Sequence, residues 1–513
     1  MKFSNWLSQR ALQKKDAIAI IFKSPSEQEG ERWTYAELES EVNDWVERLQ
    51  ALGIRSGDRI GLLLSNHPRY MMIVHALVKC EAIAVFLNIR LTAEELRWQI
   101  EDSQAQYLLY DELSKLTANI LDKKIGRLIT FEISNLSLQN YQAHSNQPNS
   151  ESIDLENIQG IFYTSGTTGK PKAVPLTYSN HFHSAIASAL NLGVEPNDNW
   201  LLCMPLFHVG GLAIAWRSVI NGTKITLLPK FDQQEVLNAI ASEQVTLISL
   251  VPTMLSRLLN HPQWQNLQKL RAILLGGAPA SPELIAQCLQ LNLPIMPTYG
   301  MTETASQITT LLPHQVPIKQ GSSGLPLFGN QLRIVDDHLQ DLEVGAIGQI
   351  LVQGASVMHG YLHQFEKAPI QAGWLHTGDL GYCDREGYLY VVSRRSDLII
   401  SGGENIYPTE IEAILLTHPH INEACIVGVS DHEWGQIVAA VIVTKAQLSL
   451  EEIRDFCEQN ALARFKLPKS IYIWESLPKT ASGKLLRQEI CDRIELISHI
   501  PLVMEGGKED LQN

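Results

Sequence analysis

The sequence predicts an α/β protein that has a large N-terminal domain of covered parallel sheets, a small β-barrel-like subdomain and a small mobile α+β domain at the C-terminus. Up to Gly321, short apolar strands alternate with segments of helical periodicity, which is typical of parallel sheets covered by helices on both faces. From Gly321 the strands become short and are separated by glycine turns. After residue 397 the alternation resumes over enough chain for an independent domain.

In the first part of the chain, apolar residues with helical spacing and near-continuous apolar runs alternate. The expected helices cover residues 5–12, 34–52, 70–79 and 93–102, and the expected strands cover residues 58–64 and 82–87. Residues 133–159 are rich in Asn, Gln and Ser, so we expect a mobile connection there that leads into a strand at Ile161.

The same alternation continues beyond Pro175. Ser179 is expected to cap a helix that ends near Leu190. The expected strands cover residues 224–228, 245–251, 271–275 and 294–298. Ligands of parallel sheets collect at the carboxyl ends of strands. The ends of the strands at Ile161, 271–275 and 294–298 are therefore expected to converge on one crevice.

Short strands predict the small antiparallel subdomain at residues 331–335, 348–352 and 387–392, with residues 374–380 inside it. The polar stretch 394–397 is the expected hinge, which divides an N-terminal domain (1–393) from a C-terminal domain (398–513). The C-terminal elements are expected as a strand from Leu398, helices over 408–417 and 450–462, and strands over 424–428 and 439–443.

Composition and charge narrow the class of protein. The net charge of −14 without a basic stripe argues against a nucleic-acid partner. Seven scattered cysteines without C-x-x-C spacing indicate reduced thiols and a cytoplasmic location. The N-terminus lacks the apolar core of a signal peptide, and the long uncharged run 200–216 is too short for a membrane span, so no membrane insertion is expected.

A polar string after the strand at Ile161 predicts a phosphate-binding loop. It contains Thr164, Ser165, Gly166, Thr167, Thr168, Gly169, Lys170 and Lys172. Glycines bring backbone N–H groups close to an anion, while hydroxyls and lysines add donors and positive charge. The loop is not of the Walker type G-x-x-x-x-G-K-S/T, because two threonines alone separate its glycines and Pro171 follows the lysine. Alone, such a string is more often a surface turn, and strings farther along the chain favour the phosphate-binding interpretation.

Five strings, in the same order, resemble the adenylate-forming superfamily of acyl-CoA synthetases, luciferases and peptide-synthetase adenylation domains. They are residues 163–172, 299–303, 377–379, 394–408 and 478–484. The similarity extends from about Trp6 to Arg487. Within the superfamily, residues 203–212 and 274–280 are most similar to the acyl-CoA ligases that act on 2-succinylbenzoate in menaquinone and phylloquinone biosynthesis.

The resemblance implies a two-step reaction with ATP, Mg²⁺ and coenzyme A. The carboxylate of 2-succinylbenzoate would attack the α-phosphorus of ATP to give an acyl-adenylate and pyrophosphate, and the thiol of CoA would then displace AMP. Three alternatives stay open: the same machinery with a fatty or hydroxycinnamic acid, a stand-alone amino-acid adenylating enzyme, and a nucleotide-binding protein without catalysis.

The resemblance also implies the nucleotide site. The loop from Thr164 to Lys172 would hold the β- and γ-phosphates, Thr302 would contact the α-phosphate, and Glu303 would coordinate Mg²⁺, which prefers oxygen ligands. Asp379 would bind the ribose, with Arg394 as a second contact to ribose or phosphate. The nucleoside is expected among Gly276, Gly277, Ala278, Pro279, Thr298, Tyr299, Gly300 and Met301.

The C-terminal domain is expected to serve both steps. Lys484 alone would be a solvated lysine, but the resemblance implies that it orients the attacking carboxylate and stabilises the charge on the α-phosphate. For the second step the domain would rotate, so that Gly402, Gly403 and Glu404 line the route of the pantetheine arm. Ser396, beside Asp397, stands where the family often has Asp or Lys as pivot.

His208 lies in an apolar run, where a histidine is more often an interior residue than a ligand. The resemblance places it at the acyl pocket, where amino-acid adenylation domains typically have an aspartate for the substrate's ammonium group. We therefore expect His208 to donate to a carboxylate or carbonyl of an acidic substrate. Weaker pocket candidates are Phe207, Gly211, Ser249, Thr298 and Gln307. The sequence identifies no residue for the aromatic carboxylate of the substrate, and it leaves the oligomeric state open.

Overall fold

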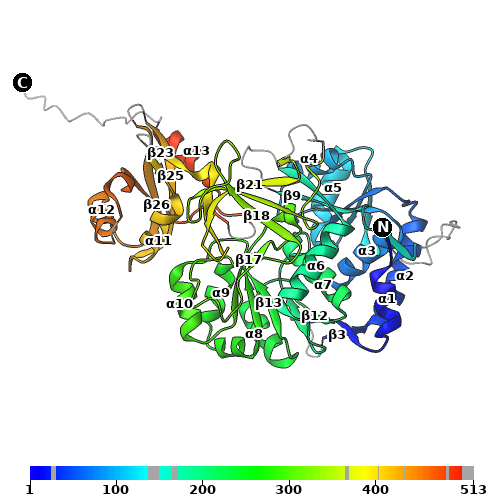
Figure 1. The fold of residues 1–513 in the computed structure, drawn as a ribbon. Coiled ribbons are helices and arrows are strands. Elements are labelled where there is room, and N and C mark those ends of the chain that lie inside the picture. Colours follow the sequence, from blue (N-terminus) through cyan, green and yellow to red (C-terminus); the bar gives the residue numbers. More distant parts are fainter. Residues whose placement is uncertain are drawn as a thin grey trace, which may run out of the picture. The chain divides into compact units, whose positions relative to one another are not determined.

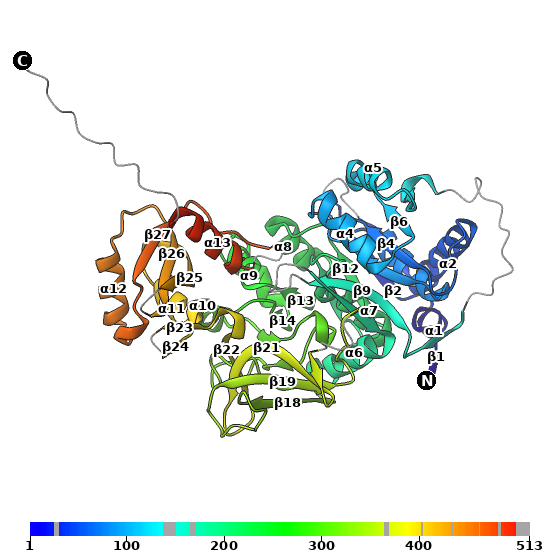
Figure 2. The same cartoon turned by 90° about the horizontal axis from the view of Figure 1, so that it is seen from above.

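The computed structural model describes residues 1–24, 30–136, 150–164, 171–363, 369–401, 404–431, 434–460, 462–480 and 484–498. The chain divides into two compact units, Met1–Val391 and Val392–Asn513, and each is described by itself (Figures 1 and 2). Both units combine helices with sheets. The predicted α/β class, with one large and one small part, is confirmed.

The largest sheet of the first unit has nine strands in the order β17-β16-β15-β14-β13-β11-β12-β2-β3. The strands from β15 to β2 run parallel, while β16, β17 and β3 pair antiparallel at the two ends. Their bounds are β2 Ile18–Phe22, β3 Glu31–Thr34, β11 Asn199–Leu202, β12 Lys224–Leu227, β13 Leu247–Leu250, β14 Ala272–Leu275, β15 Ile295–Tyr299, β16 Thr309–Thr310 and β17 Leu325–Pro326.

A second sheet of the first unit has six strands in the order β10-β9-β5-β4-β6-β7, of which β10 alone is antiparallel to its neighbour. The bounds are β4 Arg59–Leu63, β5 Ile83–Phe86, β6 Tyr107–Tyr110, β7 Ile129–Glu132, β9 Ile158–Thr164 and β10 Lys172–Thr177. The short pair β1 (Lys2–Ser4) and β8 (Ser152–Asp154) lies apart from both sheets. Part of the expected connection 133–159 is thus strand, which corrects that expectation; residues 137–149 lie outside the described part of the chain.

Helices separate the parallel strands along the chain of this unit. They are α1 Trp6–Gln13, α2 Tyr35–Ala51, α3 Pro68–Lys79, α4 Ala93–Ser103, α5 Lys115–Lys124, α6 Tyr178–Leu192, α7 Val209–Asn221, α8 Gln233–Ser242, α9 Pro252–Leu259 and α10 Pro282–Gln290. The expected cap of α6, Ser179, is wrong. Thr177 caps this helix, because its hydroxyl accepts from the backbone N–H of Asn180 while the Asn180 side chain accepts from the Thr177 backbone.

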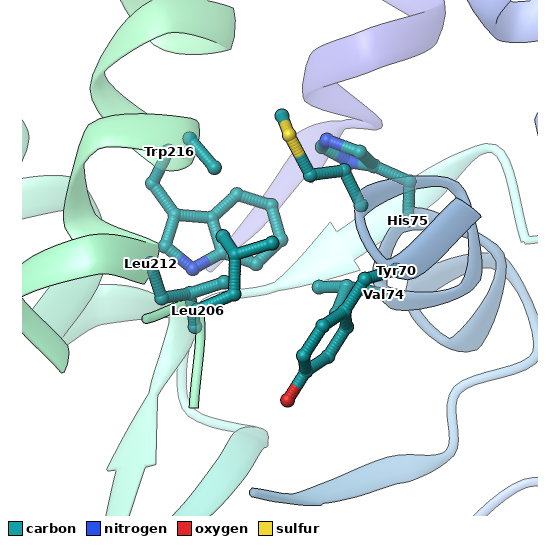
Figure 3. A pocket seen from close by; sticks show the side chains of 8 residues that line it. Tyr70, Val74, His75, Leu206, Leu212 and Trp216 are labelled. Atoms are coloured by element: carbon teal, nitrogen blue, oxygen red, sulfur yellow. The ribbon is translucent and has the colours of Figure 1, made fainter. Parts of the chain in front are cut away.

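The helices of the two sheets share one hydrophobic core. Trp216 of α7 lies opposite Tyr70 and His75 of α3, and Leu206 and Leu212 complete the contact (Figure 3). The His75 and Trp216 rings meet edge to face, with centroids 5.1 Å apart. This packing joins the two sheets into one body, because residues of α3, β4, β11 and α7 belong to the same cluster.

The antiparallel subdomain follows the last strand of the nine-stranded sheet in the chain. Its strands are β18 Asn330–Val335, β19 Gly348–Gly354, β20 Ile370–Gln371, β21 Trp374–Cys383 and β22 Leu389–Arg394. Figure 2 shows β18, β19 and β21 side by side, in agreement with their ladder of pairs. The sheet is antiparallel throughout, as expected from its short strands and glycine turns.

The second unit has its own sheet and core. Its strands are β23 Ile399–Ser401, β24 Glu404–Ile406, β25 Ile421–Asp431, β26 Gly435–Thr444 and β27 Ser470–Ile473, and its helices are α11 Pro408–Leu416, α12 Leu450–Gln459 and α13 Arg487–Ser498. Apolar clusters lie on both faces of the β25–β26 hairpin. Within the described ranges of the chain, no helix is long and apolar enough to cross a bilayer.

His181 of α6 is fully buried near Trp216 and Phe162, and burial lowers the pKa of its imidazole to about 3. In the unfolded chain the pKa is about 6.5. Below pH 6.5 the unfolded state therefore binds a proton that the folded state does not bind. We expect His181 to lower the free energy of unfolding by about 2 kcal/mol between pH 6.5 and pH 5.

Urea unfolding of wild type and His181→Gln at pH 7 and pH 5 measures this effect, because glutamine does not titrate. The loss of stability on acidification should be smaller in the variant. The exposed His314→Gln is the matched control. An equal loss in wild type and His181→Gln would contradict the prediction.

Candidate active site

The two ends of the expected phosphate-binding loop lie together. Thr164 ends β9 and Lys172 begins β10, and the two residues face each other in antiparallel register. The Thr164 hydroxyl donates to the Lys172 carbonyl oxygen over 3.4 Å. The loop thus leads from strand to strand, unlike a Walker loop. The expected contacts of Ser165, Gly166, Thr167, Thr168, Gly169 and Lys170 lie outside the described residues.

The ends of β14 and β15 are in direct contact. These strands are parallel neighbours, with Leu275 opposite Pro297. A Cβ at Gly276 would lie 2.7 Å from Cγ2 of Thr298, so only glycine allows this approach. The loop with Gly277, Ala278 and Pro279 therefore begins beside the last residues of β15.

Asp379 lies at the end of β15 although it comes from β21. The Tyr299 hydroxyl donates to Oδ2 of Asp379 over 2.7 Å. The Asp379 backbone N–H donates to the Thr377 hydroxyl, which donates in turn to the Ile350 carbonyl. These bonds fix a carboxylate beside an aromatic ring, an arrangement that suits a nucleoside, because the ring can stack and the carboxylate can accept from sugar hydroxyls.

Thr302 and Glu303 lie in a short helical turn, Thr302–Thr304, directly after Gly300 and Met301. The Tyr361 hydroxyl donates to Oε1 of Glu303 over 2.9 Å. The Lys172 ammonium lies 5.1 Å from the centroid of the same tyrosine ring. Tyr361 thus joins the expected metal ligand to the phosphate-binding loop, and the sequence analysis did not identify it.

The single carboxylate of Glu303 is sufficient for a metal ion that is also bound by the phosphates of a nucleotide. Among the residues that the structure describes, no three His, Cys, Asp or Glu side chains cluster as a metal site. Proteins usually bind Mg²⁺ through one or two carboxylates and the phosphates of the substrate. The oxygen atoms of Glu303 match that donor set.

Of the three strand ends that were expected to converge, two belong to the same sheet. The ends of β14 and β15 touch, whereas β9 belongs to the six-stranded sheet. Its partner strand β10 reaches the end of β15 through Lys172, Tyr361 and Glu303. The shared core of the two sheets makes this second approach possible.

His208 precedes the first turn of α7, where its carbonyl oxygen accepts from the N–H groups of Gly211 and Leu212. Burial, with a smaller contribution from the charge of Arg90, lowers the pKa of the His208 imidazole to about 4, so the ring is neutral at pH 7. Its Nε2 atom is shielded from solvent and has no hydrogen-bond partner among the described residues. Buried polar atoms normally have a partner, so Nε2 is suited to a ligand.

Arg217 of α7 is the functional candidate that the sequence analysis missed. It is 2% exposed, its guanidinium lies 5.3 Å from the centroid of the Trp200 ring, and its Nη2 donates to the Ser306 hydroxyl over 3.2 Å. Burial lowers the pKa of Arg217 to about 10, which leaves it charged at pH 7. The signal in the sequence was a single arginine in the apolar run of α7.

No carboxylate of the described residues forms an ion pair with Arg217, and its Nε atom lacks a hydrogen-bond partner there. A buried charge without a counter-ion is costly, so proteins rarely retain one without a ligand. Two weaker pocket candidates lie nearby: the Ser249 hydroxyl accepts from Nε1 of Trp200, and Gln307 directly follows Ser306. The arrangement places a buried cation of α7 beside polar side chains that the sequence analysis had named as candidates.

The second unit carries the remaining expected residues. Lys484 is exposed, and its backbone N–H and carbonyl both bond to Thr480. Arg394 is the last residue of β22, and the exposed Glu404 begins β24. Gly402 and Gly403 lie outside the described residues. The roles of these residues, like the limits of the hinge, stay predictions.

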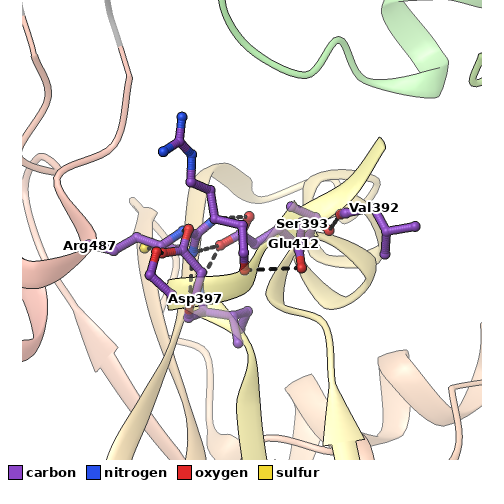
Figure 4. Close-up of polar contacts among 10 residues, drawn as sticks. Val392, Ser393, Asp397, Glu412 and Arg487 are labelled. Atoms are coloured by element: carbon purple, nitrogen blue, oxygen red, sulfur yellow. Dashed lines mark hydrogen bonds and ion pairs between the residues drawn. The ribbon is translucent and has the colours of Figure 1, made fainter. Parts of the chain in front are cut away.

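Arg487 holds the start of the second unit together (Figure 4). Its guanidinium pairs with Asp397 over 3.0 Å and with both oxygens of the buried Glu412, and it also donates to the Ile426 carbonyl. Asp397 is therefore fixed within this unit. Arg487 begins α13, shortly after Lys484 in the chain.

Comparisons with known proteins place this geometry among relatives. Residues 7–362 match the family of AMP-binding enzymes, and residues 410–484 match the AMP-binding enzyme C-terminal domain. A 2-succinylbenzoate–CoA ligase from Bacillus cereus is 42% identical over 96% of this chain and 98% of its own, and one from Bacillus cytotoxicus is 43% identical with the same coverage. The o-succinylbenzoate CoA synthetase of Bacillus subtilis, solved with the acyl-adenylate OSB-AMP, is 38% identical over both whole chains with a TM-score of 0.88; it has also been solved with ATP and magnesium.

Arg487→Met should destabilise the second unit by about 3–5 kcal/mol, because it leaves the buried Glu412 carboxylate without its partner. Urea unfolding measures the loss, and hydrogen exchange of β25 and β26 locates it in this unit. Arg493→Met is the control on the same helix, since its exposed pair with Glu489 should contribute less than about 1 kcal/mol. Equal effects of the two substitutions would refute a stabilising role of the Arg487 network.

Proposed function

Because this chain belongs to the family of AMP-binding enzymes, we propose that it joins 2-succinylbenzoate to coenzyme A through an acyl-adenylate. ATP is the second substrate, Mg²⁺ its metal ion, and the products are 2-succinylbenzoyl-CoA, AMP and pyrophosphate. Relatives of that activity cover nearly the whole chain at more than 40% identity, which supports the same acid and a place in menaquinone or phylloquinone biosynthesis. ATP and CoA are cytoplasmic metabolites, so we place the reaction in the cytoplasm.

The observation that carries the choice of acid is the buried guanidinium of Arg217, which forms no ion pair with a carboxylate of the described residues. 2-Succinylbenzoate has two carboxylates, one on the succinyl arm and one on the ring. The succinyl carboxylate is the one that reacts with ATP. The ring carboxylate stays charged and needs a cationic partner away from the phosphates. A guanidinium binds a carboxylate through two parallel hydrogen bonds. His208 is neutral, and its Nε2 has no hydrogen-bond partner in the part of the chain that the structure describes, so it can bond the carbonyl or carboxylate of the same acid.

The same observation argues against the alternatives. Fatty and hydroxycinnamic acids have one carboxylate, which is consumed in the reaction, so Arg217 would stay buried without an anion. The ammonium group of an amino acid would be repelled by Arg217. A nucleotide-binding protein without catalysis has no use for an acid pocket, and this chain retains Thr302, Glu303, Asp379 and Lys484.

In the first step, the residues at the end of β15 position ATP. Tyr299 stacks on the adenine, Asp379 accepts from the ribose hydroxyls, and Thr302 donates to the α-phosphate. Glu303 would hold Mg²⁺, which when bound would supply positive charge for the departing pyrophosphate. Lys484 orients the attacking carboxylate and stabilises the charge that develops on the α-phosphate. In the second step the CoA thiol attacks the acyl carbon. The bond between that carbon and the phosphate oxygen breaks, and AMP leaves.

The direct test is pyrophosphate release with ATP and Mg²⁺ on a panel of acids, with and without CoA. The panel contains 2-succinylbenzoate, benzoate, 4-coumarate, octanoate and mixed amino acids. Selective turnover of 2-succinylbenzoate, with its CoA thioester identified by mass, is expected. Selective turnover of another acid would refute the proposed substrate but leave the reaction type, and binding of ATP without any turnover would refute catalysis.

Arg217→Met should lower kcat/KM for 2-succinylbenzoate at least about thirtyfold, mainly through KM, because the ring carboxylate loses its partner. The control substrate is 4-oxo-4-phenylbutanoate, which has the succinyl arm but no ring carboxylate. Its kcat/KM should stay within about twofold in the variant, which also excludes loss of folding. Equal losses with both acids would place the ring carboxylate elsewhere.

Lys484→Ala should slow formation of the acyl-adenylate about 10²–10³-fold, because a charge-stabilising group is removed from the first step. Thioester formation from supplied acyl-adenylate and CoA should be largely retained. Single-turnover assays of the two half-reactions separate these rates, with Lys479→Ala, a neighbouring lysine paired with Glu423, as control. A similar loss in both half-reactions would contradict the assigned role.

A further inference from the structure

Residues 358–363 connect three parts of the site in the first unit. The Met358 backbone N–H donates to the Glu303 carbonyl oxygen over 2.8 Å, and the Leu362 N–H donates to Ala173 of β10 over 3.0 Å. Nε2 of His363 lies 2.9 Å from the carbonyl oxygen of Asp102 in α4. This segment therefore holds the turn of Glu303 and the strand of Lys172 at a fixed separation.

Tyr361, in the middle of the segment, contacts the functional groups of both. It is 7% exposed, and its hydroxyl donates to Oε1 of Glu303. The Lys172 ammonium lies over the face of its ring in a cation–π contact. The hydrogen bond fixes one carboxylate oxygen and orients the other. The ring attracts the ammonium through its negative face, which positions the cation without a counter-ion. Among the described residues no carboxylate pairs with Lys172, so its charge is available to an anion.

We propose that Tyr361 is a positioning residue for metal-bound ATP: through one side chain it orients the carboxylate of Glu303 toward the metal ion and the ammonium of Lys172 toward the polyphosphate. A metal–nucleotide complex presents a divalent cation next to phosphate oxygens. A protein that binds the complex therefore needs a carboxylate for the metal ion and a cation for the phosphates, at a fixed distance from each other. Tyr361 supplies that spacing. The inference deepens the proposed function and rests on the roles assigned there to Glu303 and Lys172.

A second tyrosine of the first unit also lies against a lysine ammonium, but this lysine is paired with carboxylates. Tyr388 is 8% exposed, and the Lys319 ammonium lies 4.6 Å from its ring centroid. Lys319, however, is paired with Asp384 over 2.7 Å and with Glu386 over 2.9 Å, so its charge is neutralised. The comparison makes Tyr388→Phe a matched control for Tyr361→Phe.

The test is ATP binding by calorimetry, without acid or CoA, over a range of Mg²⁺ concentrations and in EDTA. Tyr361→Phe removes the bond to Glu303 and keeps the ring under Lys172. Mg²⁺ increases the affinity for ATP, and the Mg²⁺ concentration that gives half of this increase should be about tenfold higher in Tyr361→Phe. The Kd for ATP in EDTA should be unchanged. Tyr361→Leu should raise both values, and Tyr388→Phe neither.

Two results would overturn the proposal: wild-type Mg²⁺ dependence in Tyr361→Phe, or an equal loss of ATP affinity with and without Mg²⁺ in that variant. The second result would indicate a general loss of structure. Turnover of 2-succinylbenzoate by the wild type is measured in parallel. If the wild type binds ATP with Mg²⁺ dependence but does not turn over the acid, the proposed function fails while the binding test of Tyr361 still decides the present inference.

Discussion

The chain reverses between Gly300 and Ser306 so tightly that a Cβ at residue 300 would lie 1.6 Å from the Ser306 carbonyl oxygen. Ala305 and Ser306 have φ angles of 49° and 103°, which cost conformational energy in residues with side chains. The buried hydroxyl of Ser184 donates to the Ala305 carbonyl and holds the turn. This reversal carries Glu303 toward Tyr361 and Ser306 toward Arg217, so the residues proposed for the nucleotide and those proposed for the acid depend on the same strained turn.

Charge is distributed differently at the site and in the rest of the protein. Away from the site, several cations with little exposure are paired with carboxylates, as Lys79 is with Glu39 and Arg271 with Asp198. Within the described residues, Lys172 and Arg217 have aromatic rings beside them instead of carboxylates. An aromatic face positions a cation but does not compete as an anion. This is why we propose the two cations as partners for anionic groups of the substrates, Lys172 for the polyphosphate and Arg217 for the second carboxylate.

Much of the fold could be predicted from the sequence. Near-continuous apolar runs gave β4 and β14 to within a residue at each end, because buried parallel strands need no polar positions. The short strand β2 (Ile18–Phe22) was not identified, since a run of that length does not distinguish a strand from a buried helical segment. At the start of α6, either Thr177 or Ser179 offers a capping hydroxyl, and only the backbone geometry at Thr177 decided between them.

The sequence by itself indicated the family and the reaction type, because phosphate binding and adenylate chemistry need particular residues at particular spacings along one stretch of chain; the residues that contact ATP stay a prediction. Only the tertiary structure decided that Arg217 is buried without a counter-ion among the described residues and that Tyr361 joins Glu303 to Lys172. A periodic pattern reports that a side chain is buried, but not which distant segment packs against it. Arg217 and Ser306, like Tyr361 and Lys172, are far apart in the sequence and become neighbours only in the folded chain, and no local pattern encodes that contact.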